Sequence, residues 1–287
     1  MYNTMSSPVR SIAWKGEIMK GGRFLIAIVV AVMSIIGYFT SSVFNPVTQE
    51  KQHVGGVTPE QEIALGVQAA PQMAQQYGGE DPDTKAQALV DKVGGTIVSH
   101  TDAGKTPYSF DFHVLADDQT INAFALPGGQ VFITDGLLKR LHTEGELAGV
   151  LGHEIGHVVA RHGAEHMAKA QLTQGLTGAA VLATYDPNNP STQRTAAVAA
   201  LIGQMVDMKF GRADELEADK LGVRLMADAG YDPRAMIGVM KTLQEAGGGS
   251  KQPEFFSTHP NPDHRIEQIQ SAISQRYPQG VPEGMNK

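Results

Sequence analysis

The pattern H-E-x-x-H, at residues 153–157, constrains the fold and chemistry of this chain more than any other feature. On a helix, residues four apart share one face with their Cβ atoms roughly 5–6 Å apart, so His153 and His157 can bind one metal ion. Glu154 lies about 100° around the helix axis from His153, beside the metal rather than on it. This arrangement is typical of a base that acts on water at the metal.

The residues around this pattern predict a helix independently of it. Thr143 and Glu146 form a capping box, in which each side chain accepts a hydrogen bond from the other residue's backbone N–H. The apolar residues that follow recur at helical spacing and are Leu147, Val150, Leu151, Ile155 and Val158. A buried helix that carries two histidines by chance is the alternative, but a capped helix in apolar surroundings favours a metal site.

The absence of cysteine from the 287 residues narrows the chemistry. It excludes disulfide bonds, a thiolate metal site, a cysteine nucleophile and a lipid-modified cysteine. The ten histidines remain as the source of nitrogen ligands. A net charge of −7 without any basic block argues against a nucleic-acid partner. The length suits one large domain or two small ones.

An apolar segment near the N-terminus predicts a membrane-spanning helix. Residues 24–44 read FLIAIVVAVMSIIGYFTSSVF and carry no charge, and a segment of this length can cross a bilayer. Four basic residues precede it, so the positive-inside rule leaves the N-terminus in the cytoplasm and sends the rest across. We interpret residues 1–45 as a leader and uncleaved signal anchor; a removed signal peptide and a buried core helix are the alternatives.

The rest of the chain divides into a linker and one domain. Residues 46–57 hold the Pro, Gly and polar residues typical of a linker. Thr58-Pro59-Glu60-Gln61 predicts a helix start, with Pro at the first helical position and Gln completing a capping box, and the helix continues to about Gln76. A second helix is predicted over residues 86–98. Residues 58–287 would form the metal-binding domain, in which we expect these two helices to serve packing.

Three short strands are predicted just before the H-E-x-x-H helix. Residues 108–115 alternate between apolar and polar side chains, and residues 121–126 and 130–134 flank a Pro-Gly-Gly turn. We expect a small antiparallel sheet beside the helix. Its outer strand can bind an extended peptide substrate by strand addition; the alternative is an edge strand that pairs with nothing. The residues concerned are Asn122, Ala123, Phe124 and Ala125.

Two apolar segments follow the H-E-x-x-H helix. Residues 172–184 and 195–210 are rich in Ala and Gly, and a loop that contains Pro and Asn separates them. Each segment is shorter than a comfortable membrane span. We expect a helical hairpin that closes over the core, with a membrane-dipping hairpin as the alternative.

The third metal ligand is predicted in residues 211–222, a helical stretch with a surplus of carboxylates. A catalytic zinc site takes three protein ligands and keeps one open position. The helix face of Glu215 continues through small or apolar residues, whereas the face of Glu217 is mostly polar, so Glu215 is favoured. Asp219, one turn on, can accept a hydrogen bond from a ligand imidazole. A fully solvated acidic face is the alternative.

These motifs resemble those of peptidase family M48, the gluzincin metalloproteases with HtpX-like and BepA-like members. The matching stretches are Asn122–Gly136, His153–His157, Glu215–Asp219 and Ser257–Ile266. The resemblance covers roughly residues 58–275, and four motifs in order are more specific than H-E-x-x-H alone. It implies an α+β, mainly α, zincin-like fold. It also implies one zinc ion bound by His153, His157 and Glu215, with Glu154 as the catalytic base.

The resemblance further implies a setting and a form of regulation. It implies an endopeptidase that hydrolyses misfolded or misassembled envelope proteins. The enzyme would be anchored in the bacterial inner membrane with its catalytic domain facing the periplasm, or be periplasmic after cleavage. In BepA-like members the matching histidine closes the metal site, which implies an inhibitory role for His259, and Arg265 is implied to stabilise the oxyanion.

Two alternatives to these implications remain open. The segment that carries His259 can instead be a turn that caps the next helix. The whole chain can instead be a membrane-anchored chaperone or assembly factor with a closed structural zinc site.

Overall fold

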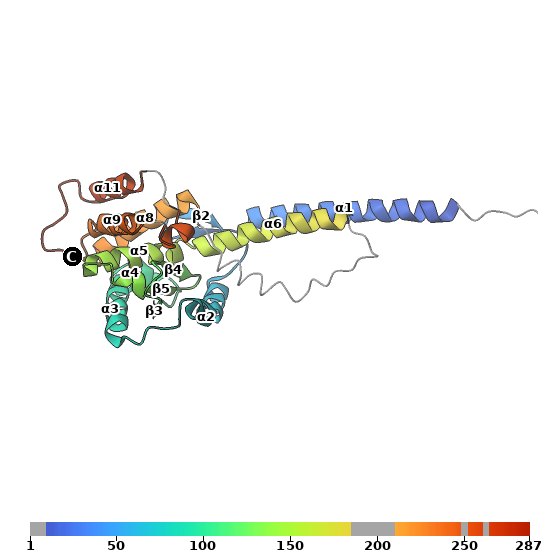
Figure 1. Ribbon diagram of the computed structural model, residues 1–287. Helices are drawn as coiled ribbons and strands as arrows, with labels where there is room; N and C mark the ends of the chain where they lie inside the picture. Colours follow the sequence, from blue (N-terminus) through green and yellow to red (C-terminus); the bar gives the residue numbers. More distant parts are fainter. Residues whose placement is uncertain (1–9, 185–209, 248–251, 261–263) are drawn as a thin grey trace, which may run out of the picture.

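The computed structural model describes residues 10–184, 210–247, 252–260 and 264–287. Within them, a body of helices around a small sheet carries an extension made of two long helices (Figure 1). The helices α1 (Arg10–Thr40) and α6 (His162–Thr184) form this extension and lie side by side. The body is a mainly helical α+β structure, in agreement with the predicted fold class.

The extension differs from two predictions. Among the described residues, no helix offers a stretch both long and apolar enough to cross a bilayer, so the span predicted over residues 24–44 is not confirmed. α6 contains the first segment of the predicted hairpin, but it runs beside α1 instead of closing over the core (Figure 1). Residues 195–209, in the second segment, lie outside the described residues.

A two-stranded hairpin covers the end of the segment predicted as a membrane anchor and the first part of the predicted linker. Its antiparallel strands are β1 (Ser42–Asn45) and β2 (Glu50–His53). The buried Asn45 amide donates a hydrogen bond to the carbonyl of Val159 at 2.7 Å, and the buried Gln52 amide donates to the carbonyl of Ala160. Since the last carbonyls of a helix lack intrahelical partners, these two amides tie the hairpin to the end of the H-E-x-x-H helix.

Two helices follow close to their predicted positions. They are α2 (Pro59–Gln76) and α3 (Thr84–His100), and the 3-10 turn η1 (Asp102–Lys105) comes after them. The predicted capping box is present, because the Thr58 hydroxyl accepts from Gln61 N–H at 3.3 Å and the Gln61 side chain accepts from Thr58 N–H at 2.9 Å. Asp83 caps α3 by accepting from the N–H of Lys85 at 2.9 Å.

The three-stranded sheet has mixed pairing. Its strands are β3 (Asp111–Leu115), β4 (Ala123–Leu126) and β5 (Gln130–Thr134), in the order β3-β5-β4. β5 pairs parallel with β3 and antiparallel with β4, so the predicted antiparallel sheet is wrong for one pair. Every residue of β5 is buried, which suits a central strand. Because β5 lies between β3 and β4, β4 is an edge strand of this sheet.

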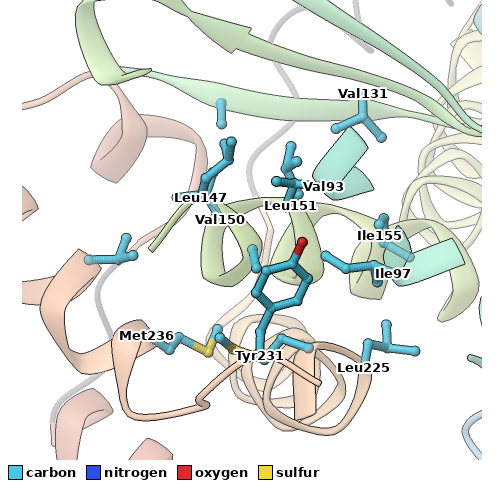
Figure 2. Close-up of a cluster of buried hydrophobic side chains, with 14 of the residues drawn as sticks. Val93, Ile97, Val131, Leu147, Val150, Leu151, Ile155, Leu225, Tyr231 and Met236 are labelled. Atoms are coloured by element: carbon cyan, nitrogen blue, oxygen red, sulfur yellow. The ribbon is translucent and has the colours of Figure 1, made fainter. Parts of the chain in front are cut away.

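The helix α5 (Glu144–Val159), which carries H-E-x-x-H, runs through the centre of the body. Thr143 caps it by accepting from Glu146 N–H at 3.1 Å, whereas the Glu146 carboxylate accepts from the N–H of His142 at 2.5 Å and not from Thr143. The predicted capping box therefore forms only by half. Figure 2 shows part of the core around α5, with the labelled side chains Val93, Ile97, Val131, Leu147, Val150, Leu151, Ile155, Leu225, Tyr231 and Met236.

The remaining helices pack around α5 and the sheet. They are α4 (Asp135–Leu138), α8 (Arg212–Asp228), α9 (Ala235–Ala246), α10 (Phe255–Thr258) and α11 (Arg265–Arg276). α8 lies along α5, α9 contacts α5, and α11 contacts both α8 and α9.

Glycines allow α5 and α8 to approach each other closely. A Cβ on Gly222 would lie 3.1 Å from the backbone N of His153 and 3.3 Å from the carbonyl carbon of Gly152. On α5, a Cβ on Gly156 would lie 3.0 Å from the carbonyl oxygen of Ala218. This contact sets the register in which the carboxylates of α8 face the histidines of α5.

Replacing Gly222 by Ala should destabilise the protein, because the added Cβ must push α5 and α8 apart. Gly95→Ala on α3 is the matched control, since a Cβ there meets nothing within 4 Å and gains the same helix propensity of about 1 kcal/mol. We expect Gly222→Ala to be less stable than this control by about 1–3 kcal/mol in chemical unfolding. Equal stability of the two variants would contradict a tight helix contact.

Candidate metal centre

Two histidines of α5 and a glutamate of α8 converge in the buried centre of the body. The Nε2 atoms of His153 and His157 lie 3.0 Å apart. The carboxylate of Glu215 lies 3.6 Å from the Nε2 of His153 and 3.4 Å from the Nε2 of His157. All three side chains are buried. The structure thus brings together the three residues that the sequence suggested as metal ligands.

The two competing glutamates of α8 point in different directions. Glu215 is completely buried, whereas 30% of the Glu217 side chain is exposed and its Oε2 lies 3.2 Å from the Nε2 of His162. The helix-face argument therefore selected the carboxylate that lies inside the cluster.

His259, which follows α10, completes the cluster. Its ring is fully buried and stacks on the ring of Phe255, with the two centroids 4.4 Å apart. Its Nδ1 lies 3.0 Å from Oε1 of Glu215 and 3.4 Å from Nε2 of His153. One donor atom from each of the four residues lies within 4.8 Å of the others, a spacing that suits ligands of a single ion.

Glu154 lies beside the cluster without a hydrogen-bond partner. It is completely buried, and neither of its carboxylate oxygens is hydrogen-bonded within the part of the chain that the structure describes. Its Oε1 lies 3.6 Å from the Nε2 of His259. Burial raises the pKa of Glu154, because the charged form loses its solvation. A carboxylate in this environment is suited to accept a proton from a molecule held at the cluster.

Asp219 and Arg265 form a buried ion pair behind His153. Arg265 donates from its Nε at 2.7 Å and from its Nη2 at 2.8 Å to the two oxygens of Asp219. Oδ1 of Asp219 lies 3.0 Å from Nδ1 of His153, as a partner of a ligand imidazole should. Nη1 of Arg265 lies 3.1 Å from Oε2 of Glu215. Arg265, which was expected to stabilise the oxyanion, therefore pairs with the carboxylates of Asp219 and Glu215.

The charged groups of the cluster shift one another's pKa values. Burial opposes protonation of His153, but its hydrogen bonds to Asp219 and Glu215 outweigh burial and raise the pKa of His153 to about 9. Burial also opposes ionisation of Glu215, but the neighbouring histidines, His259 above all, hold its pKa well below the usual range. Burial keeps the pKa of His157 well below its ordinary value. A proton on His153 thus competes with any cation.

The donor set fits a divalent cation. Oε2 of Glu215 is buried and has no hydrogen-bond partner among the described residues. Nη1 of Arg265 lies 3.1 Å from this atom as an ion-pair partner, without making a hydrogen bond, so a cation among these donors would give a buried polar atom a further partner. Imidazole nitrogens combined with a carboxylate oxygen are ligands that suit zinc among the divalent metals.

A narrow cleft lies between His259 and the edge of the sheet. It has a volume of about 30 Å³, and its lining includes β4 residues, Phe210 and His259. Of the residues predicted to bind substrate, Ala123, Phe124 and Ala125 lie in β4, and Asn122 directly precedes it. The Asn122 amide donates to the hydroxyl of Tyr77 at 3.2 Å. The predicted substrate strand therefore lines a cleft that reaches His259.

Comparisons with known proteins agree with this geometry. The model of Peptidase family M48 matches residues 84–273. The beta-barrel assembly-enhancing protease of Escherichia coli is 33% identical over 198 residues, which are 67% of this chain and 40% of that protein. The mitochondrial metalloendopeptidase OMA1 of Schizosaccharomyces pombe is 32% identical over 236 residues, which are 81% of this chain and 67% of that protein. The chain thus spans about 40% of the length of the bacterial relative.

The affinity of the protein for added Zn²⁺ should rise with pH. Because the pKa of His153 is about 9, a cation must displace a proton from this residue at any lower pH. We expect the apparent affinity to rise at least about tenfold per pH unit between about pH 6 and 8, in step with the released proton. Calorimetry in buffers of different ionisation enthalpy measures that proton. An affinity that does not change over this range would contradict a protonated His153.

Proposed function

Because this chain belongs to peptidase family M48, we propose that it is a zinc-dependent endopeptidase that hydrolyses misfolded or misassembled envelope proteins. One observation carries the proposal above all. Four buried donors gather within 4.8 Å, and the buried carboxylate of Glu154, which has no hydrogen-bond partner among the described residues, lies beside them. A structural zinc site needs its ligands but has no need of a free base.

Each residue of the cluster has a role in this reaction. His153, His157 and Glu215 would hold one zinc ion. When bound, zinc supplies a Lewis acid that acidifies water and polarises the scissile carbonyl. Glu154 accepts a proton from the attacking water and later donates it to the nitrogen of the leaving amine. Its raised pKa makes Glu154 a stronger base for the first transfer, and acid–base catalysis is most efficient when the pKa of the catalytic group lies near the working pH.

His259 would inhibit the enzyme by occupying the fourth position at the metal. Its contacts with Glu215 and His153 support this role. A closed site with four protein ligands is also what a structural zinc centre has, so the same contact supports the second candidate function, an assembly factor that does not cleave its clients. The free carboxylate of Glu154 favours the peptidase.

The substrate would bind as an additional strand along β4. An extended peptide can pair with the backbone of an edge strand whatever its sequence, which suits a protease for misfolded proteins. Two facts support this placement: β4 pairs only with β5 among the described strands, and its residues line the cleft that contains His259.

The helix α1 would attach the enzyme to the bacterial inner membrane, with the catalytic domain facing the periplasm. If this segment is removed as a signal peptide, the enzyme would be periplasmic. Apolar side chains of α1 are exposed, among them Leu25 at 64%, Met33 at 62% and Phe39 at 62%. No charged residue occurs between positions 24 and 49. Such a surface is stabilised by contact with lipid.

Two substitutions in the full chain separate the peptidase from the assembly factor. Glu154→Gln should keep zinc and lower the hydrolysis of casein by about 10²–10⁴-fold, because the base is lost while the ligands remain. His259→Ala should keep zinc and raise hydrolysis above wild type, since the fourth position becomes open. Metal content and peptide release are measured for wild type and both variants.

The opposite results are equally informative. Wild-type hydrolysis by Glu154→Gln would exclude Glu154 as the base. Bound zinc without hydrolysis in wild type and in His259→Ala would favour the assembly factor.

Membrane attachment can be tested with exposed valines of similar accessibility. Val32 on α1 is 45% exposed and Val67 on α2 is 55% exposed. In bacterial cells, Val32→Lys should move part of the protein from the membrane fraction to the carbonate-soluble fraction, because a charged side chain in place of an apolar one disfavours contact of α1 with the lipid interior. Val67→Lys is the control and should leave the distribution unchanged. Wild-type protein that is fully extracted by carbonate would contradict the anchor.

A further inference from the structure

A line of polar side chains leads away from His157 on the side opposite the cluster. Nδ1 of His157 lies 2.8 Å from Nδ1 of His162. Nε2 of His162 lies 3.2 Å from Oε2 of Glu217. His162 is 1% exposed. Its position is therefore determined by packing as well as by these two contacts.

The hydrogen bonds along this line have one consistent direction if His157 binds zinc, as the proposed function requires. The Nε2 of His157 faces Glu215 and the cluster, so a metal there would leave the proton on Nδ1. That N–H then donates to Nδ1 of His162, which must accept. The remaining proton of His162 is on Nε2 and donates to the carboxylate of Glu217.

We propose that His162 and Glu217 form a positioning relay that fixes the tautomer and ring orientation of His157. The other histidine ligand has a direct counterpart, because Nδ1 of His153 lies 3.0 Å from the carboxylate of Asp219. Both imidazoles thus end at a carboxylate of α8, one directly and one through a second imidazole. Such partners of ligand histidines commonly change metal affinity by about 10–100-fold when they are removed.

The backbone after α5 places His162 for this contact. Arg161 has a positive φ of 57°, a conformation that costs a residue with a Cβ roughly 1–2 kcal/mol. Its buried guanidinium donates from Nε to Glu62 at 2.9 Å and from Nη2 to the carbonyl of Val57 at 2.8 Å. These contacts hold the left-handed residue in place, and the chain turns so that His162 lies against His157.

The ring of His157 is also held on its face. Phe210 stacks on it, with the ring centroids 3.9 Å apart and the planes inclined by 23°. This stacking limits tilt but leaves rotation within the plane of the ring free. The hydrogen bond to His162 supplies the missing restraint, which is why we assign the relay a role in orientation.

A second histidine on α6 provides the control. His166 lies one turn after His162, and its Nε2 lies 2.8 Å from the Asp214 carboxylate of α8. The pair resembles His162 with Glu217 in chemistry and in the helices it joins. The hydrogen bonds and ion pairs of the described residues do not connect it to His157. Its ring contacts Phe210 edge-on, with the centroids 5.6 Å apart, and because a Phe at position 166 can keep this ring contact, His166→Phe should leave the metal site unchanged.

The test measures metal binding and does not depend on activity. Wild type, His162→Phe, His162→Asn and His166→Phe are titrated with Zn²⁺ against a competing chelator, and the visible spectrum of bound Co²⁺ is recorded. We expect His162→Phe to weaken Zn²⁺ binding about 10–100-fold and to alter the Co²⁺ spectrum. His162→Asn keeps an acceptor beside His157 and should recover part of the affinity. His166→Phe should match wild type.

Glu217→Ala carries the test if His162→Phe does not fold, because Glu217 is partly exposed. It should weaken Zn²⁺ binding in the same direction and to a smaller extent. The relay is overturned if Glu217→Ala and His162→Asn both bind Zn²⁺ as wild type does, or if His166→Phe loses as much affinity as His162→Phe.

Failure of the underlying zinc site would look different. In that case wild type would not bind Zn²⁺, or His153→Ala would bind it as tightly as wild type, and the relay would be rejected together with the proposed function. Tight binding by wild type, loss in His153→Ala and no change in His162→Phe would reject the relay alone.

Discussion

The close contact between α5 and α8 is the constraint on which the metal centre depends. Where Gly152 and Gly222 meet, no side chain separates the two helix backbones. Only at this separation do the carboxylates of Glu215 and Asp219 reach the imidazoles of α5. Buried polar groups are costly without partners, so the helix contact and the polar contacts stabilise the same register. The same helix also supplies the carboxylates that contact the two histidines of α6: Glu217 contacts His162, and Asp214 contacts His166.

The balance of charge decides what this buried centre can bind. Glu154, Glu215 and Asp219 are buried carboxylates, and within the part of the chain described here Arg265 is the guanidinium that faces them. Removal of one partner from a buried ion pair typically costs about 3–5 kcal/mol. The excess of negative charge explains why the pKa of His153 is raised to about 9. The same excess would stabilise a divalent cation, which competes with the proton for one imidazole.

Much of the local structure could be predicted because it depends on neighbours in the sequence. The capping box of Thr58 and Gln61 forms as predicted, and α2 ends at the predicted residue, Gln76. The sheet was predicted less well. The alternation of side chains identifies strands, but it does not say which strand takes the centre or in which direction its neighbours run: β5 is buried throughout and pairs parallel with β3.

The sequence by itself determined which residues share a helix face. The spacing of 3.6 residues per turn places His153 beside His157 and separates Glu215 from Glu217 whatever the rest of the chain does. Only the tertiary structure decided which distant residues meet them. His259 is 106 positions from His153, and Glu217 is 55 positions from His162. Such contacts depend on the packing of α5, α6, α8 and α10 around a common core, which no local pattern encodes.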